Sequence, residues 1–231
     1  SGIMTRMMEA FFSEAPFSSL RNYFNVYAVH VVSSAEGYEN SGAHALGTWF
    51  GEGTQVGGDD DKCIPYAKKA VGASALENAV IVVAMNSNRY GGTCQMYVPS
   101  ATGAYGDGTS IAYLPLCASE SVFSSVLCHE AGGHGFAKLG DEYAGIDDDI
   151  PSSLRSRAER LADNYGWMKN LDFTGSTSKV KWARLLEDSR YSEEGLGLYL
   201  GGYDYTRGVW RPSSISIMRY NMGGFNAPSR E

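Results

Sequence analysis

The chain contains 231 residues, of which 43% are hydrophobic and 19% are charged. This hydrophobic content is enough for a sizeable core and excludes a wholly disordered chain. With 19 Lys and Arg against 26 Asp and Glu, the net charge is −7, which argues against a nucleic-acid-binding protein or a binder of anionic membranes. No stretch approaches the roughly 18 apolar residues of a membrane span, and the start at Ser1 has no apolar signal sequence. We therefore expect any targeting peptide to lie outside this sequence.

The first third of the chain alternates between strand and helix patterns. Residues 24–32 are rich in β-branched and aromatic side chains, which predicts a strand. A glycine- and aspartate-rich stretch at 36–61 predicts a loop. A helix is expected over residues 64–76, opened by Pro65, because proline is tolerated in the first turn of a helix.

The next segments predict a sheet followed by a helix. The continuous apolar run at 79–85 predicts a central strand covered on both faces. Short strands are expected at 96–98 and 111–116, and Pro115 confines the second to a sheet edge or a strand end. A helix is then expected from Ser119, a good N-cap, toward Leu139.

Beyond Gly145 the sequence changes character. The run Asp147–Asp149 predicts a polar linker, and residues 152–165 predict an amphipathic helix. The rest is rich in glycine and tyrosine and is predicted to be mostly irregular. Like the aspartates at 59–61, the 147–149 run lacks the spaced oxygen pattern of a calcium loop, so both are interpreted as solvated loops. The sequence also contains four cysteines. None lies in a Cys-x-x-Cys pair, which favours buried reduced thiols, with one or two disulfides as the alternative; they are Cys63, Cys94, Cys117 and Cys128.

The most informative stretch lies at residues 126–143 and contains His129, Glu130 and His134 in one expected helix. Two imidazoles from one helix can hold Zn²⁺ and leave a position for water, and the carboxylate between them can accept a proton from that water. This is the chemistry of the His-Glu-x-x-His zinc enzymes. Here one extra residue separates the histidines, which turns them roughly 140° apart in a regular α-helix. Two partly exposed histidines on a glycine-weakened helix are therefore the alternative.

The glycines between the two histidines offer a way to bring the rings together. Gly132 and Gly133 cost about 1 kcal/mol each relative to alanine in a helix, without an evident structural benefit. A π-bulge absorbs one residue, and glycine tolerates the backbone angles that it needs. We therefore predict a widened turn at about residues 129–135, with both imidazoles on one side and Glu130 beside the open metal position.

A second signal lies at residues 216–220, Ser-Ile-Met-Arg-Tyr. This segment resembles the Met-turn of the metzincins, in which a methionine lies beneath the metal and a tyrosine two residues later faces it. Ordinary core packing is the alternative for Met218. A core or hydrogen-bonding tyrosine is the alternative for Tyr220.

With both segments in view, the chain resembles the bacterial IgA-peptidase family, family sixty-four of the metallopeptidases. The specific part of the resemblance is the block at 129–143, which runs from His-Glu to Asp-Glu-Tyr. Supporting matches are residues 24–29, the Tyr-Gly-Gly sequence at 90–92 and residues 225–230.

The resemblance implies a zinc-dependent endopeptidase that is secreted, periplasmic or on the surface of a gut bacterium. Its substrates would be proteins or peptides, with host glycoproteins and immunoglobulins among the candidates. Residue by residue, it implies His129 and His134 as Zn²⁺ ligands, Glu130 as general base and Tyr220 as a stabiliser of the transition state. His30 and His44 have no matching role.

The third zinc ligand is where the sequence departs from the metzincin pattern. Metzincins place it six residues after the second histidine, and here that residue is Gly140, which has no side chain. Asp141, the next residue, is the favoured third ligand. Glu142 is an alternative third ligand. If it does not bind the metal, a salt bridge to a neighbouring Lys or Arg is its expected role. Glu159 is another alternative ligand, as in thermolysin-like enzymes, but its place on a polar helix face favours a solvated ion pair.

The expected fold is α/β and metzincin-like, a single catalytic domain over residues 1–231. A twisted mixed sheet and the active-site helix form an upper subdomain (about 1–143), and an irregular lower subdomain (about 144–231) carries the Met-turn. An extended substrate is expected to pair with a sheet edge near 111–116. The competing hypothesis is a catalytically silent, metal-stabilised surface binding module. The presence of Glu130 favours the enzyme, because a binding module needs no base.

Overall fold

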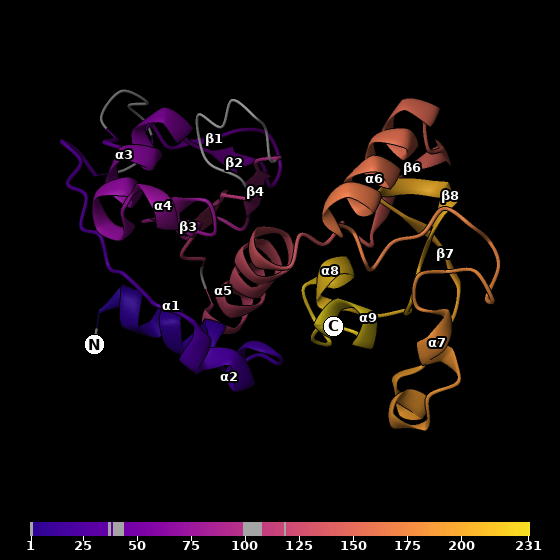
Figure 1. Ribbon diagram of the computed structural model, residues 1–231. Helices are drawn as coiled ribbons and strands as arrows, with labels where there is room; N and C mark the ends of the chain where they lie inside the picture. Colours follow the sequence, from indigo (N-terminus) through magenta and orange to yellow (C-terminus); the bar gives the residue numbers. More distant parts are fainter. Residues whose placement is uncertain (1, 37, 39–43, 99–107, 118) are drawn as a thin grey trace. The chain divides into compact units, whose positions relative to one another are not determined.

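The computed structural model describes residues 2–36, 38, 44–98, 108–117 and 119–231. The chain divides into two compact units, Ser1–Phe136 and Ala137–Glu231. Figure 1 shows the helices and strands of each unit. The mixture of helices with mixed sheets agrees with the α/β prediction. That the two units act as one catalytic domain stays a prediction.

Unit 1 is built on a three-stranded sheet in the order β3 (Val80–Met85), β5 (Ser110–Pro115) and β4 (Thr93–Met96). Strand β5 is parallel to β3 and antiparallel to β4. The prediction of a central strand at 79–85 is wrong, because β3 lies at an edge and the fully buried β5 lies in the middle. The expected substrate pairing at 111–116 is wrong for the same reason, since both edges of β5 are already paired. Pro115 does end its strand, as predicted.

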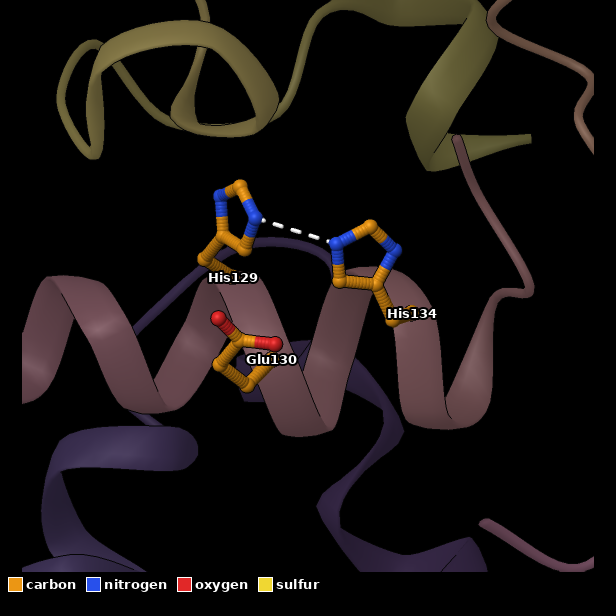
Figure 2. A group of neighbouring side chains, drawn as sticks. All are labelled: His129, Glu130 and His134. Atoms are coloured by element: carbon orange, nitrogen blue, oxygen red, sulfur yellow. Dashed lines mark hydrogen bonds between the residues drawn. The ribbon is translucent and has the colours of Figure 1, made fainter. Parts of the chain in front are cut away.

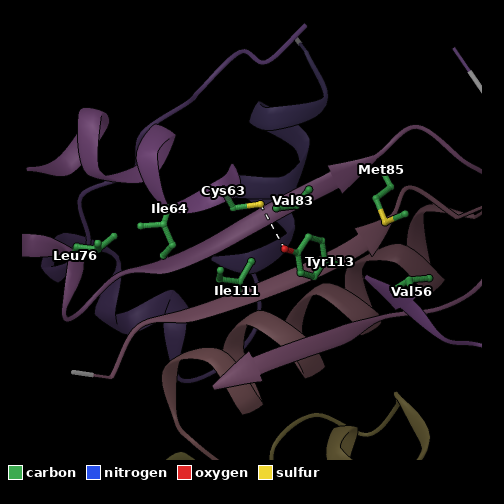
Figure 3. Close-up of a cluster of buried hydrophobic side chains, with 8 residues drawn as sticks. All are labelled: Val56, Cys63, Ile64, Leu76, Val83, Met85, Ile111 and Tyr113. Atoms are coloured by element: carbon green, nitrogen blue, oxygen red, sulfur yellow. Dashed lines mark hydrogen bonds between the residues drawn. The ribbon is translucent and has the colours of Figure 1, made fainter. Parts of the chain in front are cut away.

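Both faces of this sheet are covered, because the side chains of β5 alternate between two cores. Ile111 and Tyr113 pack in a cluster with side chains of the helices α3 (Asp60–Val71) and α4 (Ala73–Leu76), shown in Figure 3. Ala112 and Leu114 pack on the opposite face in a second cluster with side chains of α1 (Ile3–Phe11) and α5 (Glu120–Leu127). The sheet is therefore the middle layer of unit 1, and α5 is held against it.

The helices on the first face begin earlier than predicted. Helix α3 spans Asp60–Val71, whereas the expected helix was 64–76, so Pro65 lies inside the helix and does not open it. Two aspartates in the first turn of α3 favour this start, because negative charge is stabilised at a helix N-terminus. The helix ends at Gly72, whose φ of 84° lies outside the helical region, and α4 (Ala73–Leu76) follows.

Two other segments of unit 1 also differ from the prediction. Residues 24–32 form no strand, because β-forming side chains still need a partner strand and none pairs with this segment. The predicted loop at 36–61 contains a short hairpin of β1 (Trp49–Phe50) and β2 (Val56–Gly57). Within that range, residues 37 and 39–43 lie outside the described residues.

The N-terminal segment packs beside the end of the helix that carries His129 and His134. It comprises α1, α2 (Phe17–Leu20) and η1 (Arg21–Tyr23). The rings of Phe17 and Phe24 lie 5.5 Å and 4.9 Å from that of Phe136, measured between centroids. This aromatic group supports the helix two residues after His134.

Unit 2 contains a second mixed sheet in the order β6 (Ala144–Asp149), β8 (Asp204–Arg211) and β7 (Tyr199–Gly202). The polar linker predicted at 147–149 is therefore an edge strand. Its three aspartates all lie within ion-pair distance of Arg207 on β8, which compensates part of their charge in the strand.

Helix α6 (Ser152–Tyr165) confirms the amphipathic helix predicted at 152–165. The prediction that the rest is mostly irregular is wrong in part, because it also contains strands and short helices. A core around the buried Trp182 holds this part together. The short helices are α7 (Ala183–Leu186), η3 (Ser189–Glu194), α8 (Ile217–Tyr220) and α9 (Ala227–Arg230).

The four cysteines form no disulfides, which agrees with the favoured interpretation of reduced thiols. Three of them are buried, and burial raises the pKa of the Cys128 thiol to about 12. These thiols therefore act as small apolar side chains of unit 1. No described helix combines the length and apolar character that crossing a bilayer requires.

Candidate metal centre

The helix that carries the predicted metal ligands begins at a conventional cap and then widens. The Ser119 hydroxyl accepts a hydrogen bond from the Val122 N–H at 3.2 Å, as the N-cap prediction required. Helix α5 continues directly into the π-helix η2 (Cys128–Phe136). In a π-helix each hydrogen bond spans five residues, so side chains five positions apart lie about one turn apart. The predicted widened turn at 129–135 is confirmed, and it extends over nine residues.

The wide helix places the two predicted zinc ligands side by side. His129 Nε2 and His134 Nε2 lie 3.1 Å apart, and Figure 2 shows both rings on the same side of the helix. The Glu130 carboxylate joins them, with one ligand atom from each of the three residues inside a group no more than 4.8 Å across. All three side chains are buried. The alternative of two partly exposed histidines is thereby excluded, because both are buried.

The donor set fits a zinc ion. Two imidazole nitrogens at about 2.0–2.1 Å from one tetrahedral Zn²⁺ lie roughly 3.3 Å from each other. The observed separation of 3.1 Å is close to that value. Nitrogen donors from two histidines are typical of catalytic zinc sites, which leave one position for water. The His129–Glu130–His134 group can therefore bind a metal ion, and zinc is the typical one for such donors.

The other candidates for metal binding in the sequence do not form such a group. Among the described residues, neither the aspartates at 59–61 nor those at 147–149 gather three ligand atoms in one place. His30 lies exposed in the extended segment. His44 is buried against the ring of Tyr38, with centroids 4.3 Å apart. The two histidines without an assigned role are thus a surface residue and a packing residue.

Asp141 and Tyr220 both lie in unit 2. The Asp141 backbone carbonyl accepts a hydrogen bond from the Tyr203 N–H at 2.8 Å, which fixes the chain at this position. Tyr220 ends the short helix α8, half exposed, and its ring lies 4.4 Å from the guanidinium carbon of Arg219. Met218 in the same helix is fully buried. The assignment of Asp141 as ligand and of Tyr220 as a transition-state stabiliser stays a prediction.

Glu142 is fully buried inside unit 2, and its carboxylate is engaged by neutral side chains. Oε2 accepts a hydrogen bond from Ser216 Oγ at 2.6 Å, and Oε1 accepts from Asn170 Nδ2 at 3.0 Å. Asn226 Nδ2 donates to both oxygens, at 2.9 Å and 3.2 Å. Burial raises the pKa of this carboxyl, and these donors oppose the rise. The structure thus shows a hydrogen-bonded anchor in place of the expected salt bridge.

This anchor holds the segment that follows the metal-site helix against the segment with the buried methionine. The Glu142 N–H donates to the Met218 carbonyl at 2.8 Å. Asn170 also brackets Gly140, since its Oδ1 accepts from the Gly140 N–H and its Nδ2 donates to the Gly140 carbonyl. Sequence reasoning missed this cluster, because its members come from distant segments and share no local pattern.

Glu159 behaves as its place on the polar face of α6 suggested. Its carboxylate pairs with Arg155 one turn earlier, at 2.9 Å, and both side chains are well exposed. An exposed pair of this kind contributes less than about 1 kcal/mol to stability. The solvated ion pair that the sequence favoured at this position is present.

A comparison with protein families gives the identity that the geometry suggests. The family described as IgA Peptidase M64 matches residues 4–192. The chain belongs to this family. The match covers the His129–Glu130–His134 group and also the Asp141 and Glu142 positions of unit 2. A comparison with curated proteins finds no match. Membership in the M64 family makes the metal-binding group of unit 1 the expected centre of a peptidase.

Proposed function

We propose that this M64 family member is a zinc-dependent endopeptidase, with His129 and His134 as zinc ligands. The observation that carries the proposal is the 3.1 Å separation of the two Nε2 atoms, with a buried carboxylate beside them. Family membership supplies the reaction class, the hydrolysis of peptide bonds. A zinc ion at this position would act as a Lewis acid toward the scissile carbonyl and activate a water molecule as nucleophile.

Glu130 is proposed as the general base. Its carboxylate lies within the same small group as the two imidazoles, so it can accept a proton from water placed there. It would then deliver that proton to the nitrogen of the leaving amine. Burial of Glu130 keeps the carboxylate away from bulk solvent, which strengthens its interaction with a nearby proton donor.

Two residues of unit 2 complete the proposed machinery. Asp141 is the proposed third ligand, because a carboxylate oxygen is a suitable zinc donor and Gly140 offers none. Tyr220 is proposed to donate a hydrogen bond to the oxyanion that develops on the substrate carbonyl. The turn around the buried Met218 is proposed as a Met-turn. The resemblance to the metzincins supports all three assignments.

The proposed substrates are proteins or peptides, with host glycoproteins and immunoglobulins among them. The family description supports this proposal, since it names IgA. Secretion, or a place in the periplasm or on the surface of a gut bacterium, is the matching proposal for location. The composition is compatible with it, because charged residues are few at 19%.

The experiment that tests the proposal combines metal analysis with a peptidase assay on a peptide library. Purified protein should contain about one zinc per chain, and a chelator should abolish hydrolysis until zinc is restored. His134→Ala should lose the zinc, because the remaining imidazole of His129 and the proposed Asp141 carboxylate make a weak site. His30→Ala is the matched control and should keep both zinc and activity, since His30 is exposed and has no assigned role.

The possible outcomes separate the enzyme from the competing binding module. Unchanged zinc content in His134→Ala would remove this histidine from the ligand set. One zinc per chain without any hydrolysis would identify a silent module with a structural metal. Zinc-dependent hydrolysis within the library peptides that His134→Ala loses and His30→Ala keeps would establish the endopeptidase.

A further inference from the structure

The Tyr-Gly-Gly sequence at 90–92 has no role in the function described so far. It directly precedes β4, the edge strand next to the metal-site helix in unit 1. Neither Gly91 nor Gly92 has a positive φ, so other residue types could adopt these backbone angles. The reason for glycine at these positions is therefore steric, because neighbouring atoms occupy the volume that a side chain would need.

The space at Gly92 is filled by side chains of the metal-site helix. A Cβ atom added to Gly92 would lie 2.8 Å from Glu130 Oε1 and 2.9 Å from Glu130 Cγ. It would also lie 2.7 Å from Cγ1 of Val126. All three distances are shorter than real Cβ contacts, so any side chain at position 92 displaces at least one neighbour.

The two neighbours come from one helix and differ in what they do. Val126 and Glu130 lie four residues apart, which places them one above the other on the same helix face. Val126 is part of the hydrophobic cluster beneath the sheet, so its contact with Gly92 is ordinary packing. Glu130 belongs to the metal-binding group, so its contact with Gly92 determines where its carboxylate lies.

The backbone on the Gly92 side of this contact cannot easily retreat. Thr93, the next residue, pairs with Tyr113 on the buried central strand. On the other side, a Cβ at Gly91 would lie 2.6 Å from the Thr54 carbonyl oxygen, so the backbone there is already tightly packed. The side chains of Val126 and Glu130 are therefore the parts that move when position 92 gains an atom, and the Glu130 carboxylate is the flexible end among them.

We propose that Gly92 is a positioning residue for the reaction, because its missing side chain leaves the space that the Glu130 carboxylate occupies. This inference rests on the proposed function, in which Glu130 is the general base. It assigns the residue that directly precedes β4 to the catalytic site, as the backbone against which the base packs. An alanine at position 92 moves the carboxylate and leaves the two imidazoles in place.

The test is the Gly92→Ala variant, measured for zinc content, Tm, kcat and KM on one peptide substrate. Zinc content and KM should match the unchanged protein, while kcat should fall roughly 100-fold, the lower range for losing general base catalysis. Gly145→Ala is the matched control, because a Cβ there meets nothing within 4 Å and the position has no positive φ. It should leave zinc content, Tm and kcat unchanged.

Two double variants distinguish the contact with Glu130 from simple packing. In Gly92→Ala/Val126→Ala the packing clash is removed, so stability should recover in part while kcat stays low. In the Glu130→Ala background, Gly92→Ala should lower Tm less than it does in the unchanged protein, because the clashing atoms are absent. Recovery of kcat in the first double variant, or equal Tm losses in both backgrounds, would overturn the inference.

Failure of the inference is distinguishable from failure of the proposed function. If the unchanged protein has no chelator-sensitive hydrolysis, the proposed function fails before position 92 is tested. If the unchanged protein is active and folded Gly92→Ala with bound zinc keeps its kcat, only the positioning role is wrong.

Discussion

Two buried glutamates, one in each unit, illustrate opposite uses of the same side chain. Glu130 in unit 1 is 8% exposed and lies with two histidines in a group that can take a metal ion. Glu142 in unit 2 is 0% exposed, and both of its oxygens accept hydrogen bonds from Ser216, Asn170 and Asn226. The first carboxylate is proposed to exchange a proton, and the second holds two chain segments together through its hydrogen bonds.

The comparison shows that burial alone does not identify a catalytic carboxylate. What distinguishes the two is the chemistry of their neighbours. Imidazole nitrogens next to Glu130 can share a metal ion and its water with the carboxylate. Amide and hydroxyl donors around Glu142 satisfy its lone pairs and leave no comparable site for a reacting group.

Replacement of the Glu130 carboxylate by an amide should have the largest effect on activity. Glu130→Gln should lower kcat by about 10²–10⁴-fold, because the amide cannot accept the proton from water. Its zinc content and Tm should stay close to those of the unchanged protein, since both imidazoles remain. Steady-state kinetics with metal analysis measures this effect. Near-normal turnover would contradict the assignment of Glu130 as the base.

Substitution of Asp141, the residue before Glu142, should have the second largest effect. Asp141→Ala should weaken zinc affinity by more than about 100-fold, because loss of a direct ligand exceeds the 10–100-fold cost of losing an outer partner. Competition with a chromophoric chelator measures the affinity. Glu159→Ala is the control and should keep its zinc, because Glu159 is engaged in an exposed pair with Arg155. The reverse ranking would assign the third ligand to Glu159.

The Glu142 anchor should affect stability more than zinc affinity or the chemical step. Glu142→Gln should reduce the free energy of unfolding by about 1–3 kcal/mol, since an amide cannot accept hydrogen bonds at both of its ends. Urea denaturation of the zinc-free protein measures the loss without a contribution from metal binding. An unchanged midpoint would show that the hydrogen bonds around Glu142 contribute little.

Removal of a single donor to this anchor should have the smallest effect. Ser216→Ala deletes one hydroxyl that donates to Glu142 Oε2 at 2.6 Å, while Asn226 still donates to the same oxygen. We expect a loss of about 1 kcal/mol in unfolding free energy. Ser189→Ala, in the short helix η3, is a suitable exposed control. A loss in Ser216→Ala as large as that in Glu142→Gln would mean that this one bond accounts for the anchor.

Local patterns in the sequence predicted the local features of the site. Ser119 marked the start of the helix because a serine hydroxyl satisfies a free backbone N–H. The extra residue before His134 and the glycines around it predicted the widened helix. In both cases the physical cause lies within a few residues of its effect, so one sequence is enough to find it.

Features that depend on distant segments could not be predicted in the same way. The apolar run at 79–85 indicated a buried strand but carried no information about its neighbours, so its edge position was missed. Residues 24–32 have the composition of a strand and still pair with none. The Glu142 cluster joins segments up to 84 residues apart, which no local periodicity marks.

The nine-residue π-helix has a consequence for how metal sites are found in sequences. A search for His-Glu-x-x-His counts residues, but the two imidazoles respond to turns of the helix, and a wider turn holds one residue more. His129 and His134 converge although their spacing does not match that pattern. An insertion inside an active-site helix can therefore be neutral for the ligands when the backbone widens with it. Searches that allow one additional residue, with glycine nearby, would recover sites of this kind.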